Sequence, residues 1–339
     1  MKINGRNIGY VDRPYVIAEM SCNHGGDISS AFALIRDAVD SGCDAIKFQC
    51  YEPRSLTIDC GLKIESGAWA GTDLHKLYEQ AQTPMDWMPP LFDFAAAQGI
   101  TAFASVYCLE GLAMLERCDC PAYKIASFEA CHYELLEAVG KTKKPTIVSL
   151  GVSDDGEILE AIATLTTNGC PSVCLLHCTS SYPATGLELS RINDLKRWLN
   201  GRALIGYSDH TAAGLSAIAV AAGACVLERH IKTSDVKSAD YAFSSDYEEM
   251  RVYVYGARLA HEAMYNAVES TEAHLKRSVR AIADIKAGER LTRSNVAVLR
   301  PNGGLHPRLF EVALGSEALC DVERGEAITK DNVDIIGVC

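Results

Sequence analysis

Two lysines interrupt apolar runs of the sequence, at positions where a charge is costly to bury. Lys47 stands in Ala-Ile-Lys-Phe and Lys124 in Tyr-Lys-Ile-Ala. A buried ammonium group is unfavourable unless an anion accompanies it. The pattern therefore predicts either a site for a phosphate- or carboxylate-bearing substrate, or a structural pair between a lysine and a glutamate. We favour the anion site, because such burial concentrates in active sites.

Histidines and glutamates near the ends of other apolar runs indicate further chemistry. His210 and His230 could share one divalent cation and leave positions for water and substrate, but two ligands alone do not specify a metal. Histidines held only by structural hydrogen bonds are the alternative. Asp209 could orient the His210 imidazole or cap the next helix. Glu19 and Glu129 could transfer protons or hold sugar hydroxyls, and Glu19 could instead pair with a lysine.

The elements that must position these residues alternate between β-rich runs and amphipathic helical segments. The predicted strands are Tyr15–Ala18, Ala45–Phe48, Thr101–Ala104, Ala122–Ile125, Thr146–Ser149, Val173–His177, Ala203–Ile205 and Cys225–Leu227. The predicted helices are Ala31–Ser41, Met85–Gln98, Leu109–Glu116, Tyr133–Gly140, Asp155–Thr166, Leu189–Leu199, Leu215–Ala222 and Ser245–Ala267. Repeated β-α units over about 250 residues predict a parallel (β/α)8 TIM barrel. An open doubly wound sheet ranks second, because it usually has fewer strands and no GxGxxG follows the first strand.

Polar residues stand at the carboxyl end of every predicted strand. In a TIM barrel the working residues gather at these ends. Besides the residues already named, the strand ends carry Gln49, Ser105, Ser127, Ser149, His177, Thr179, Ser180, Ser181, Ser208 and Glu228. Because all eight predicted strands end in polar residues, the sequence predicts an active site at one mouth of the barrel.

The sequence changes character near residue 270. Residues 1–270 make up the predicted barrel domain, and residues 271–339 a linker and a small β-rich domain. The short strands predicted in the small domain are Ser278–Ile282, Ala297–Leu299, Asp321–Arg324 and Ile335–Val338. Arg300 precedes a glycine-rich turn at Pro301–Gly304. The Arg300 side chain matters for catalysis only if this turn reaches the mouth of a barrel.

Composition narrows the class of protein. The net charge of −12 and the pI near 5.2 argue against nucleic-acid or anionic-membrane partners, which require a basic surface. The sequence shows no signal peptide and no apolar run of roughly 20 residues. The 14 cysteines form no CxxC pair, which argues against a zinc knuckle and points to a reducing compartment. We therefore expect a cytoplasmic protein with small-molecule substrates.

The strand ends resemble those of the sialic acid synthases, which join phosphoenolpyruvate to an N-acetylated hexose derivative. The matching segments are Ile17–Asp27 (IAEMSCNHGGD), Asp44–Gln49 (DAIKFQ), Tyr123–Glu129 (YKIASFE), Leu175–Pro183 (LLHCTSSYP), Gly206–Thr211 (GYSDHT) and Leu227–Ile231 (LERHI). Val279–Pro301 resembles the antifreeze-like module (SAF, β-clip) that follows the barrel in this family. The resemblance covers nearly the whole chain in order, and implies a TIM barrel followed by an SAF domain.

The resemblance also implies a role for each matched residue. Phosphoenolpyruvate would be held by Lys47, Ser105, Lys124, Ser127, Ser149 and Ser208. A divalent ion, Mn or Mg, would be bound by His210 and His230. The acceptor sugar would be faced by Gln49, Tyr182, Asp240 and Glu19, with Glu129 near the reacting centre. Glu19, Glu129 and His210 would be the catalytic residues. Arg300 would enter the barrel of a second subunit and contact the sugar's N-acyl group, which implies a domain-swapped homodimer.

Within this family, several segments resemble the pseudaminic acid synthases. They are Trp69–Gly71, Leu77–Tyr78, Thr83–Pro84, Trp87, Asp240–Ser244 and Gly304–Pro307. Phe128 is a further match, because the sialic and legionaminic synthases usually carry Gly at that position. We therefore favour 2,4-diacetamido-2,4,6-trideoxy-altrose as the acceptor. The alternative is an N-acetylneuraminate or legionaminate synthase acting on a mannose-configured acceptor. A barrel aldolase or a shorter-chain synthase ranks lower because of the SAF tail, and a sugar- or ice-binding protein because of the polar strand ends.

Three places depart from the family's pattern. They are Val106, the pair Leu150 and Val152, and Ser181. We expect them to border the phosphoenolpyruvate pocket and to weaken or reshape it.

Overall fold

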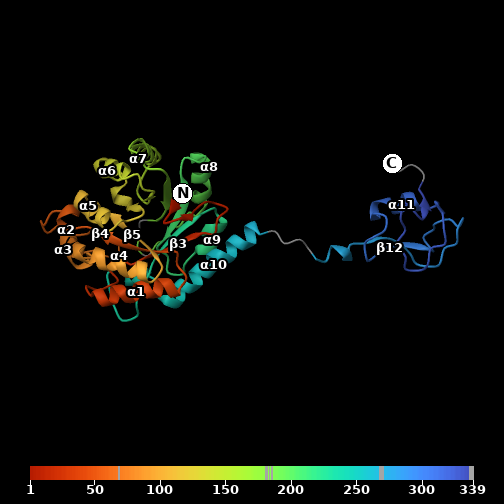
Figure 1. Ribbon diagram of the computed structural model, residues 1–339, viewed down its shortest axis with the longest axis horizontal. Coiled ribbons are helices and arrows are strands. Elements are labelled where there is room, and N and C mark those ends of the chain that lie inside the picture. Colours follow the sequence, from red (N-terminus) through yellow and green to blue (C-terminus); the bar gives the residue numbers. More distant parts are fainter. Residues whose placement is uncertain (68, 180–181, 183, 185, 267–270, 336–339) are drawn as a thin grey trace. The chain divides into compact units, whose positions relative to one another are not determined.

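The computed structural model describes residues 1–339 apart from 68, 180–181, 183, 185, 267–270 and 336–339 (Figure 1). The chain divides into two compact units, Met1–Asn266 and Ala267–Cys339. Each unit has its own hydrophobic core. The division lies close to residue 270, where the sequence changes character.

Within the described part of the first unit, eight parallel strands close into a barrel. Each strand pairs with the next along the chain, and the last pairs with the first. The strands are β3 (Tyr15–Glu19), β4 (Ala45–Cys50), β5 (Thr101–Val106), β6 (Tyr123–Ile125), β7 (Thr146–Ser149), β8 (Val173–His177), β9 (Leu204–Asp209) and β10 (Val226–His230). This closure confirms the predicted (β/α)8 barrel and excludes the open doubly wound sheet.

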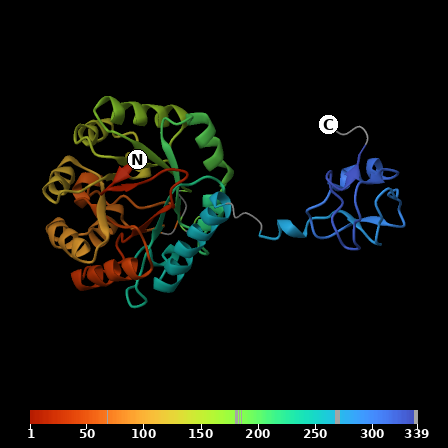
Figure 2. The same cartoon turned by 45° about the vertical axis from the view of Figure 1, so that its right-hand side comes forward.

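Helices surround the barrel in chain order, from red through green to teal in Figure 2. They are α1 (Ile28–Asp40), α4 (Met88–Ala97), α5 (Leu109–Arg117), α6 (Tyr133–Lys141), α7 (Asp155–Thr167), α8 (Ser190–Leu199), α9 (Ser216–Ala221) and α10 (Tyr247–Tyr265). Helix α1 begins at Asp27, whose side chain accepts a hydrogen bond from Ser29 N, and buries one apolar stripe against the strands. Asp154 and Asp246 begin α7 and α10 with capping boxes.

The barrel core is packed closely on both faces of the strands. Every residue of β3 is buried, because helices cover the outer face and side chains fill the inner one. Gly206 in β9 permits a close approach of β10, since a Cβ atom there would lie 2.4 Å from Val226 O. A larger residue at this position would push the two strands apart.

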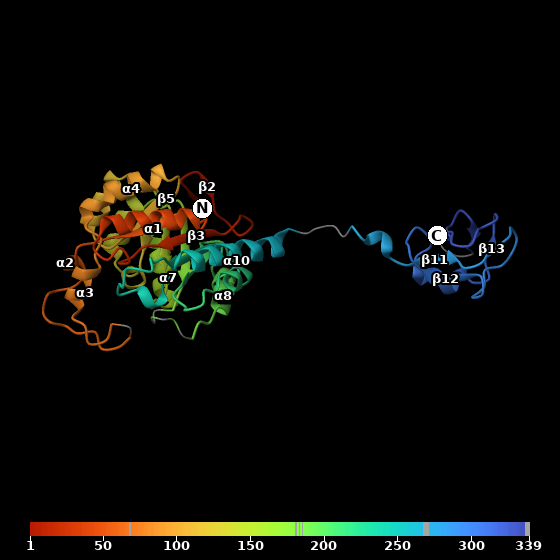
Figure 3. The same ribbon diagram turned by 90° about the horizontal axis from the view of Figure 1, so that it is seen from below.

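The structure differs from the predicted elements in two respects. Strands β9 and β10 continue to Asp209 and His230, past the predicted ends at Ile205 and Leu227. Polar side chains of the two strands pair with one another there, Ser208 with Glu228 and Asp209 with Arg229. A hairpin, β1 (Lys2–Ile3) with β2 (Arg6–Asn7), and two helices, α2 (Pro53–Leu56) and α3 (Leu74–Ala81), were not predicted. Figure 3 shows α2, α3 and the loop between them projecting from one end of the barrel.

Among its described residues, the second unit contains two short antiparallel pairs of strands. They are β11 (Ser278–Ala281) with β12 (Val296–Leu299), and β13 (Glu317–Ala318) with β14 (Val333–Asp334), while α11 (Phe310–Ala313) precedes β13. The first two strands predicted in this unit are confirmed. The predicted strand Asp321–Arg324 is not a strand but a single isolated bridge between Val322 and Ile285. Of the predicted strand Ile335–Val338, only Ile335 belongs to the described residues.

Among the described residues, no helix has the length and apolar character that crossing a membrane requires.

Candidate active site at the carboxyl ends of the barrel strands

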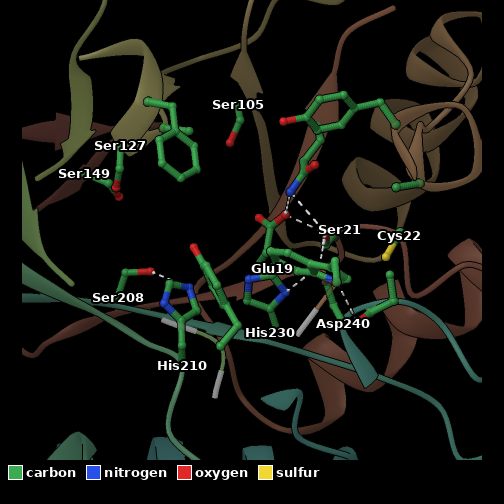
Figure 4. Close-up of a pocket in the computed structure, with 18 of the residues that line it drawn as sticks. Glu19, Ser21, Cys22, Ser105, Ser127, Ser149, Ser208, His210, His230 and Asp240 are labelled. Atoms are coloured by element: carbon green, nitrogen blue, oxygen red, sulfur yellow. Dashed lines mark hydrogen bonds and ion pairs between the residues drawn. The ribbon is translucent and has the colours of Figure 1, made fainter. Parts of the chain in front are cut away.

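A cavity of about 580 Å³ opens at the carboxyl ends of the strands. The barrel residues to which the family resemblance gives a role all line it: Glu19, Lys47, Gln49, Ser105, Lys124, Ser127, Glu129, Ser149, Tyr182, Ser208, His210, His230 and Asp240. Figure 4 shows Ser127 and Ser149 together on one side of the cavity, and His230 and Asp240 on the other. The barrel thus brings together residues that are far apart in the sequence.

Four buried charges form the floor of this cavity. Lys47 is ion-paired with Glu19, and its Nζ lies 3.7 Å from Glu228 Oε2. Lys124 Nζ lies 3.4 Å from Glu228 Oε1. All four side chains are at most 4% exposed. The structural lysine–glutamate pair that the sequence left open is therefore present, and the hydroxyl-bearing residues line the same cavity.

The two lysines differ in how well their charges are compensated. Burial opposes the charge on Lys47, but Glu19 and Glu228 outweigh it and raise the pKa of that ammonium. Burial also opposes the charge on Lys124, and here it prevails over Glu228 and lowers the pKa. A second anion beside Lys124 would offset its burial. The floor of the cavity is therefore suited to an anionic ligand.

The Glu228 carboxylate holds the floor together, since both lysines depend on it. We expect Glu228→Gln to lower the free energy of unfolding by about 3 kcal/mol, because breaking a buried pair leaves an uncompensated charge. Urea unfolding at pH 7 measures this. The control Glu248→Gln breaks an exposed pair with Arg251 and should cost less than about 1 kcal/mol. Equal losses in the two variants would contradict a stabilising role for the floor.

Serine hydroxyls surround the lysines. Ser105 Oγ accepts a hydrogen bond from Lys47 at 2.8 Å, and Ser208 Oγ donates to Glu228 Oε1 at 2.9 Å. Ser127 Oγ accepts from Gly151 N at 3.2 Å, and Ser149 ends β7. A serine hydroxyl can both donate and accept, so these groups can turn toward phosphate or carboxylate oxygens.

His210 and His230 lie side by side, with ring centroids 5.4 Å apart. Burial lowers the pKa of His210 to about 4, and burial together with His210 lowers that of His230 well below its usual value. Both rings are therefore neutral at pH 7. Each buried Nδ1 makes no hydrogen bond within the described residues. Neutral imidazoles with a free nitrogen are suitable ligands for a divalent cation.

The rest of a metal shell is not supplied by a ready-made cluster. Among the described residues, no three His, Cys, Asp or Glu side chains converge as a metal site. Asp240 Oδ2 lies 3.5 Å from His230 Nδ1. The two histidines fit part of a coordination shell, to be completed by water and substrate.

A hydrogen-bonded chain links Asp240 to Glu19. Asp240 Oδ2 accepts from Ser21 Oγ at 2.6 Å, and Ser21 Oγ accepts from Gln49 Nε2 at 3.1 Å. Gln49 Nε2 also donates to Glu19 Oε1 at 2.9 Å. Ser21 has φ of 46°, a left-handed conformation that is uncommon for serine and is found at functional sites. This polar chain could bind the hydroxyl and amide groups of a sugar.

Glu129 is a carboxyl group of the cavity whose pKa suits proton transfer at neutral pH. Burial raises its pKa to about 7. Its Oε2 has no hydrogen-bond partner among the described residues. Since general acids and bases work best when their pKa lies near the operating pH, Glu129 can accept or donate a proton at neutral pH.

Comparison with known proteins agrees with this geometry. The model of the NeuB family matches residues 34–269, and the model of the SAF domain matches residues 276–334. The chain belongs to the NeuB family. A pseudaminic acid synthase from Campylobacter jejuni is 37% identical over 317 residues, covering 90% of this chain and 92% of that protein. The pseudaminic acid synthase of Helicobacter pylori is 32% identical, covering 90% and 93%.

A solved structure also matches this NeuB-family chain. The N-acetylneuraminic acid synthetase of Leptospira borgpetersenii superimposes with a TM-score of 0.72 at 28% identity. The match covers 80% of this chain and 93% of that structure. The resemblance and the fold class inferred from the sequence are thereby confirmed.

The sequence analysis gave no role to several residues that line the cavity of this NeuB-family chain. Glu228 was seen at a strand end, but its contacts with both lysines were not. The other unassigned lining residues include Ser21, Cys22, Tyr51, Tyr107, Phe243 and a group of residues between 56 and 81. Strand parity could have found Glu228, because it lies two residues before His230 and faces the same side.

Other expected residues lie elsewhere. Asp209 accepts hydrogen bonds from Thr211 N and Leu215 N, so it organises the start of α9 and does not orient His210. His177 contacts Leu187 O. Neither Asp209 nor His177 belongs to the described residues that line the cavity.

The departures from the family pattern lie beside residues of the pocket. Val106 stands between the lining residues Ser105 and Tyr107, and Leu150 and Val152 follow the lining residue Ser149. None of these three is itself among the described residues that line the cavity. Ser181 lies outside the described residues. Arg300 follows β12 in the second unit and is exposed. The turn after it is fixed to β11, because Pro301 O accepts from Ser278 Oγ at 2.8 Å.

Proposed function

We propose that this chain condenses phosphoenolpyruvate with an N-acetylated amino-sugar aldehyde, giving a nine-carbon nonulosonic acid and phosphate. The observation that carries the proposal is the lining of a single cavity. Buried lysines and serine hydroxyls suited to an anion share it with two neutral histidines and the chain from Asp240 to Glu19. Membership of the NeuB family gives independent support.

Phosphoenolpyruvate occupies the lysine side of the cavity. Lys47 and Lys124 bind its phosphate and carboxylate, and the surrounding hydroxyls of Ser105, Ser127, Ser149 and Ser208 donate hydrogen bonds. Bonds from charged donors are about twice as strong as neutral ones. The ligand also supplies the second anion that the buried Lys124 lacks.

His210 and His230 hold a divalent cation, Mn or Mg, through nitrogens that burial keeps neutral. When bound, the cation polarises the aldehyde oxygen of the acceptor. Gln49, Tyr182, Asp240 and Glu19 orient the sugar.

The reaction forms a carbon–carbon bond and a carbon–oxygen bond to water, and it breaks the carbon–oxygen bond between C2 and the phosphate. C3 of phosphoenolpyruvate attacks the aldehyde carbon, whose oxygen takes up a proton. Water then adds to C2, and its proton passes to Glu129. The resulting tetrahedral centre collapses to the keto acid and expels phosphate with the bridging oxygen. Glu129 is favoured over Glu19 as the proton acceptor, because Glu19 is engaged with Lys47.

This assignment predicts a pH dependence. Below its pKa of about 7, Glu129 is protonated and cannot accept a proton. The kcat should therefore rise with pH through about 7 and level off above it. Glu129→Gln should lower kcat by about 10²- to 10⁴-fold and remove this rise. The same rise in Glu129→Gln, measured from pH 5.5 to 8.5, would assign the titration to another group.

The favoured acceptor is 2,4-diacetamido-2,4,6-trideoxy-altrose, which makes the product pseudaminic acid. The two pseudaminic acid synthases support this, as do Phe128 and the segment Asp240–Ser244. The alternative is N-acetylneuraminate or legionaminate synthesis from a mannose-configured sugar.

Phosphate release with each acceptor tests this choice. The altrose sugar should be turned over, and the corresponding mannose isomer and N-acetylmannosamine should not. Preference for a mannose-configured sugar would replace the proposed acceptor, while silence with all three would contradict the proposed function.

We also propose a domain-swapped homodimer in which Arg300 of one chain contacts the N-acyl group in the barrel of the other. Lys47→Met and Arg300→Ala should each be inactive alone. An equimolar mixture that has exchanged subunits should recover about a quarter of wild-type activity, since half of the dimers then contain one complete site. A mixture as inactive as its components would contradict the swap.

A cytoplasmic location completes the proposal. The described cysteines are free thiols, which is typical of a reducing compartment.

A further inference from the structure

Helix α3 carries an apolar stripe that does not join the protein core. The stripe consists of Leu74, Leu77, Tyr78 and Ala81, spaced as one face of a helix. Such a stripe normally packs against the core. Here every residue of α3 is half-buried or exposed, and these four residues line the cavity. The apolar face of α3 is therefore directed at the cavity and whatever fills it.

Further apolar side chains extend this surface. Leu56 at the end of α2, together with Ile64 and Trp69 in the loop before α3, also lines the cavity. We call Leu56, Ile64, Trp69, Leu74, Leu77 and Tyr78 the α2–α3 wall. The wall lines the same cavity as the lysines and histidines, so a ligand can contact both.

The wall is held in place by specific contacts. Ile64 N donates to Thr72 O at 3.0 Å, and Gly71 N donates to Ile64 O at 2.8 Å, which closes the loop on itself. Trp69 Nε1 donates to Ala239 O at 3.2 Å, next to Asp240. The Trp69 ring packs on that of Tyr182, with centroids 5.0 Å apart. The loop is thus attached to the segments that follow β8 and β10, whose residues Tyr182 and Ala239 also line the cavity.

The cavity has a polar lining and an apolar lining, and each suits a different end of one ligand. The charged floor and the chain from Asp240 to Glu19 can bind the reacting carbons and the polar groups. Ser66 of the same loop also lines the cavity, but the wall itself offers mainly carbon atoms, against which a hydroxyl group would lose its bonds to water. We propose that the wall binds the methyl-bearing end of the acceptor and selects a 6-deoxy sugar over its 6-hydroxy counterpart. This inference rests on the proposed function.

The expected selectivity is moderate. An apolar pocket rejects a ligand that differs by one added hydroxyl by about 10²-fold. We therefore expect kcat/KM for 2,4-diacetamido-2,4,6-trideoxy-altrose to exceed that for the same sugar with a 6-hydroxyl group by about 10²-fold.

Leu77→Ser tests the wall directly. It places a hydroxyl on the cavity side of α3, and the fold should tolerate it because Leu77 is only half-buried. The ratio of the two kcat/KM values should fall to about 10 or less. Leu77→Met, which keeps the surface apolar, should retain the ratio. The control Leu62→Ser changes an exposed leucine of the same loop that is 56% exposed, and should leave the ratio unchanged.

Binding of the two sugars to metal-stripped protein, measured by calorimetry, gives a readout independent of turnover. Tighter binding of the deoxy sugar, weakened in Leu77→Ser and retained in Leu62→Ser, supports the wall. Turnover with equal kcat/KM for both sugars, or a Leu77→Ser variant that loses activity on both equally, overturns the inference and leaves the proposed function standing. Absence of turnover in wild type overturns the proposed function, and the binding ratio then decides the wall by itself.

Discussion

Replacing Lys47 with methionine should lower kcat/KM for phosphoenolpyruvate by about 10³-fold. Lys47 is the ammonium group shared by Glu19 and Glu228, with a hydrogen bond to Ser105. Its loss removes a preorganised donor to the substrate anion, which alone costs about 10²- to 10³-fold. It also leaves two buried carboxylates that repel that anion. The largest loss should appear in the KM for phosphoenolpyruvate, measured by phosphate release.

The matched control is Lys144→Met. Lys144 also pairs with a glutamate, Glu116, at 2.6 Å, but this pair lies outside the cavity. Its kcat/KM should stay within about threefold of wild type. If Lys47→Met folds, as judged by its circular dichroism, and keeps wild-type KM for phosphoenolpyruvate, the anion site is not at Lys47.

Replacing His210 with alanine should abolish tight binding of Mn and reduce turnover by about 10³-fold. The reason is that a metal ion contributes several kcal/mol to the transition state, and each 1.36 kcal/mol is a factor of ten in rate. His230→Ala should behave alike, since the two rings lie side by side with neutral, unbonded Nδ1 atoms within the described structure. Chelator treatment of wild type should reproduce the loss, and added Mn should reverse it.

His261→Ala is the control for these variants. His261 contacts Val11 O on the barrel's outer surface, away from the cavity lining. Its Mn affinity, measured by calorimetry, and its turnover should match wild type. Full Mn affinity in His210→Ala would exclude this histidine as a ligand.

Much of the barrel could be predicted because its chemistry is local and periodic. Strands buried on both faces read as apolar runs, as in Tyr15–Ala18, and the helices between them show one apolar stripe each. The rule that a barrel gathers strand ends at one mouth then placed Lys47, Lys124 and His230 together without any knowledge of distances.

The contacts within the site were harder to predict, because they depend on which way each side chain points. In β10, Glu228 and His230 face the cavity while Arg229, between them, points outward to Ser245 and Tyr253. The strand predicted from the apolar pattern ends at Leu227, because the charged residues that follow look like the start of an exposed segment. In the structure those charges are buried and the strand continues. Strand parity places Glu228 on the cavity side, but its contacts with Lys47 and Lys124 depend on how the strands pair across the barrel.

The α2–α3 wall was missed for a different reason. Its leucines and its tryptophan show too little periodicity before Leu74 to predict an element, and α3 is a short helix. Apolar residues in a loop are ordinarily assigned to the core. These residues face the cavity because Trp69 holds their loop against Ala239 at the cavity's edge. Ala239 is 170 residues away in the sequence, so the contact could not be predicted from a local pattern.

The most direct test of the proposed chemistry follows the bridging oxygen of phosphoenolpyruvate. The substrate is labelled with ¹⁸O between C2 and phosphorus and incubated with the Mn-loaded protein and the altrose acceptor. Phosphate and sugar acid are then analysed by mass spectrometry. The proposed mechanism predicts ¹⁸O in the released phosphate and a nine-carbon acid as product, with no release when the acceptor is omitted. Retention of ¹⁸O in the organic product would mean that the P–O bond breaks, and would contradict the condensation proposed for this cavity.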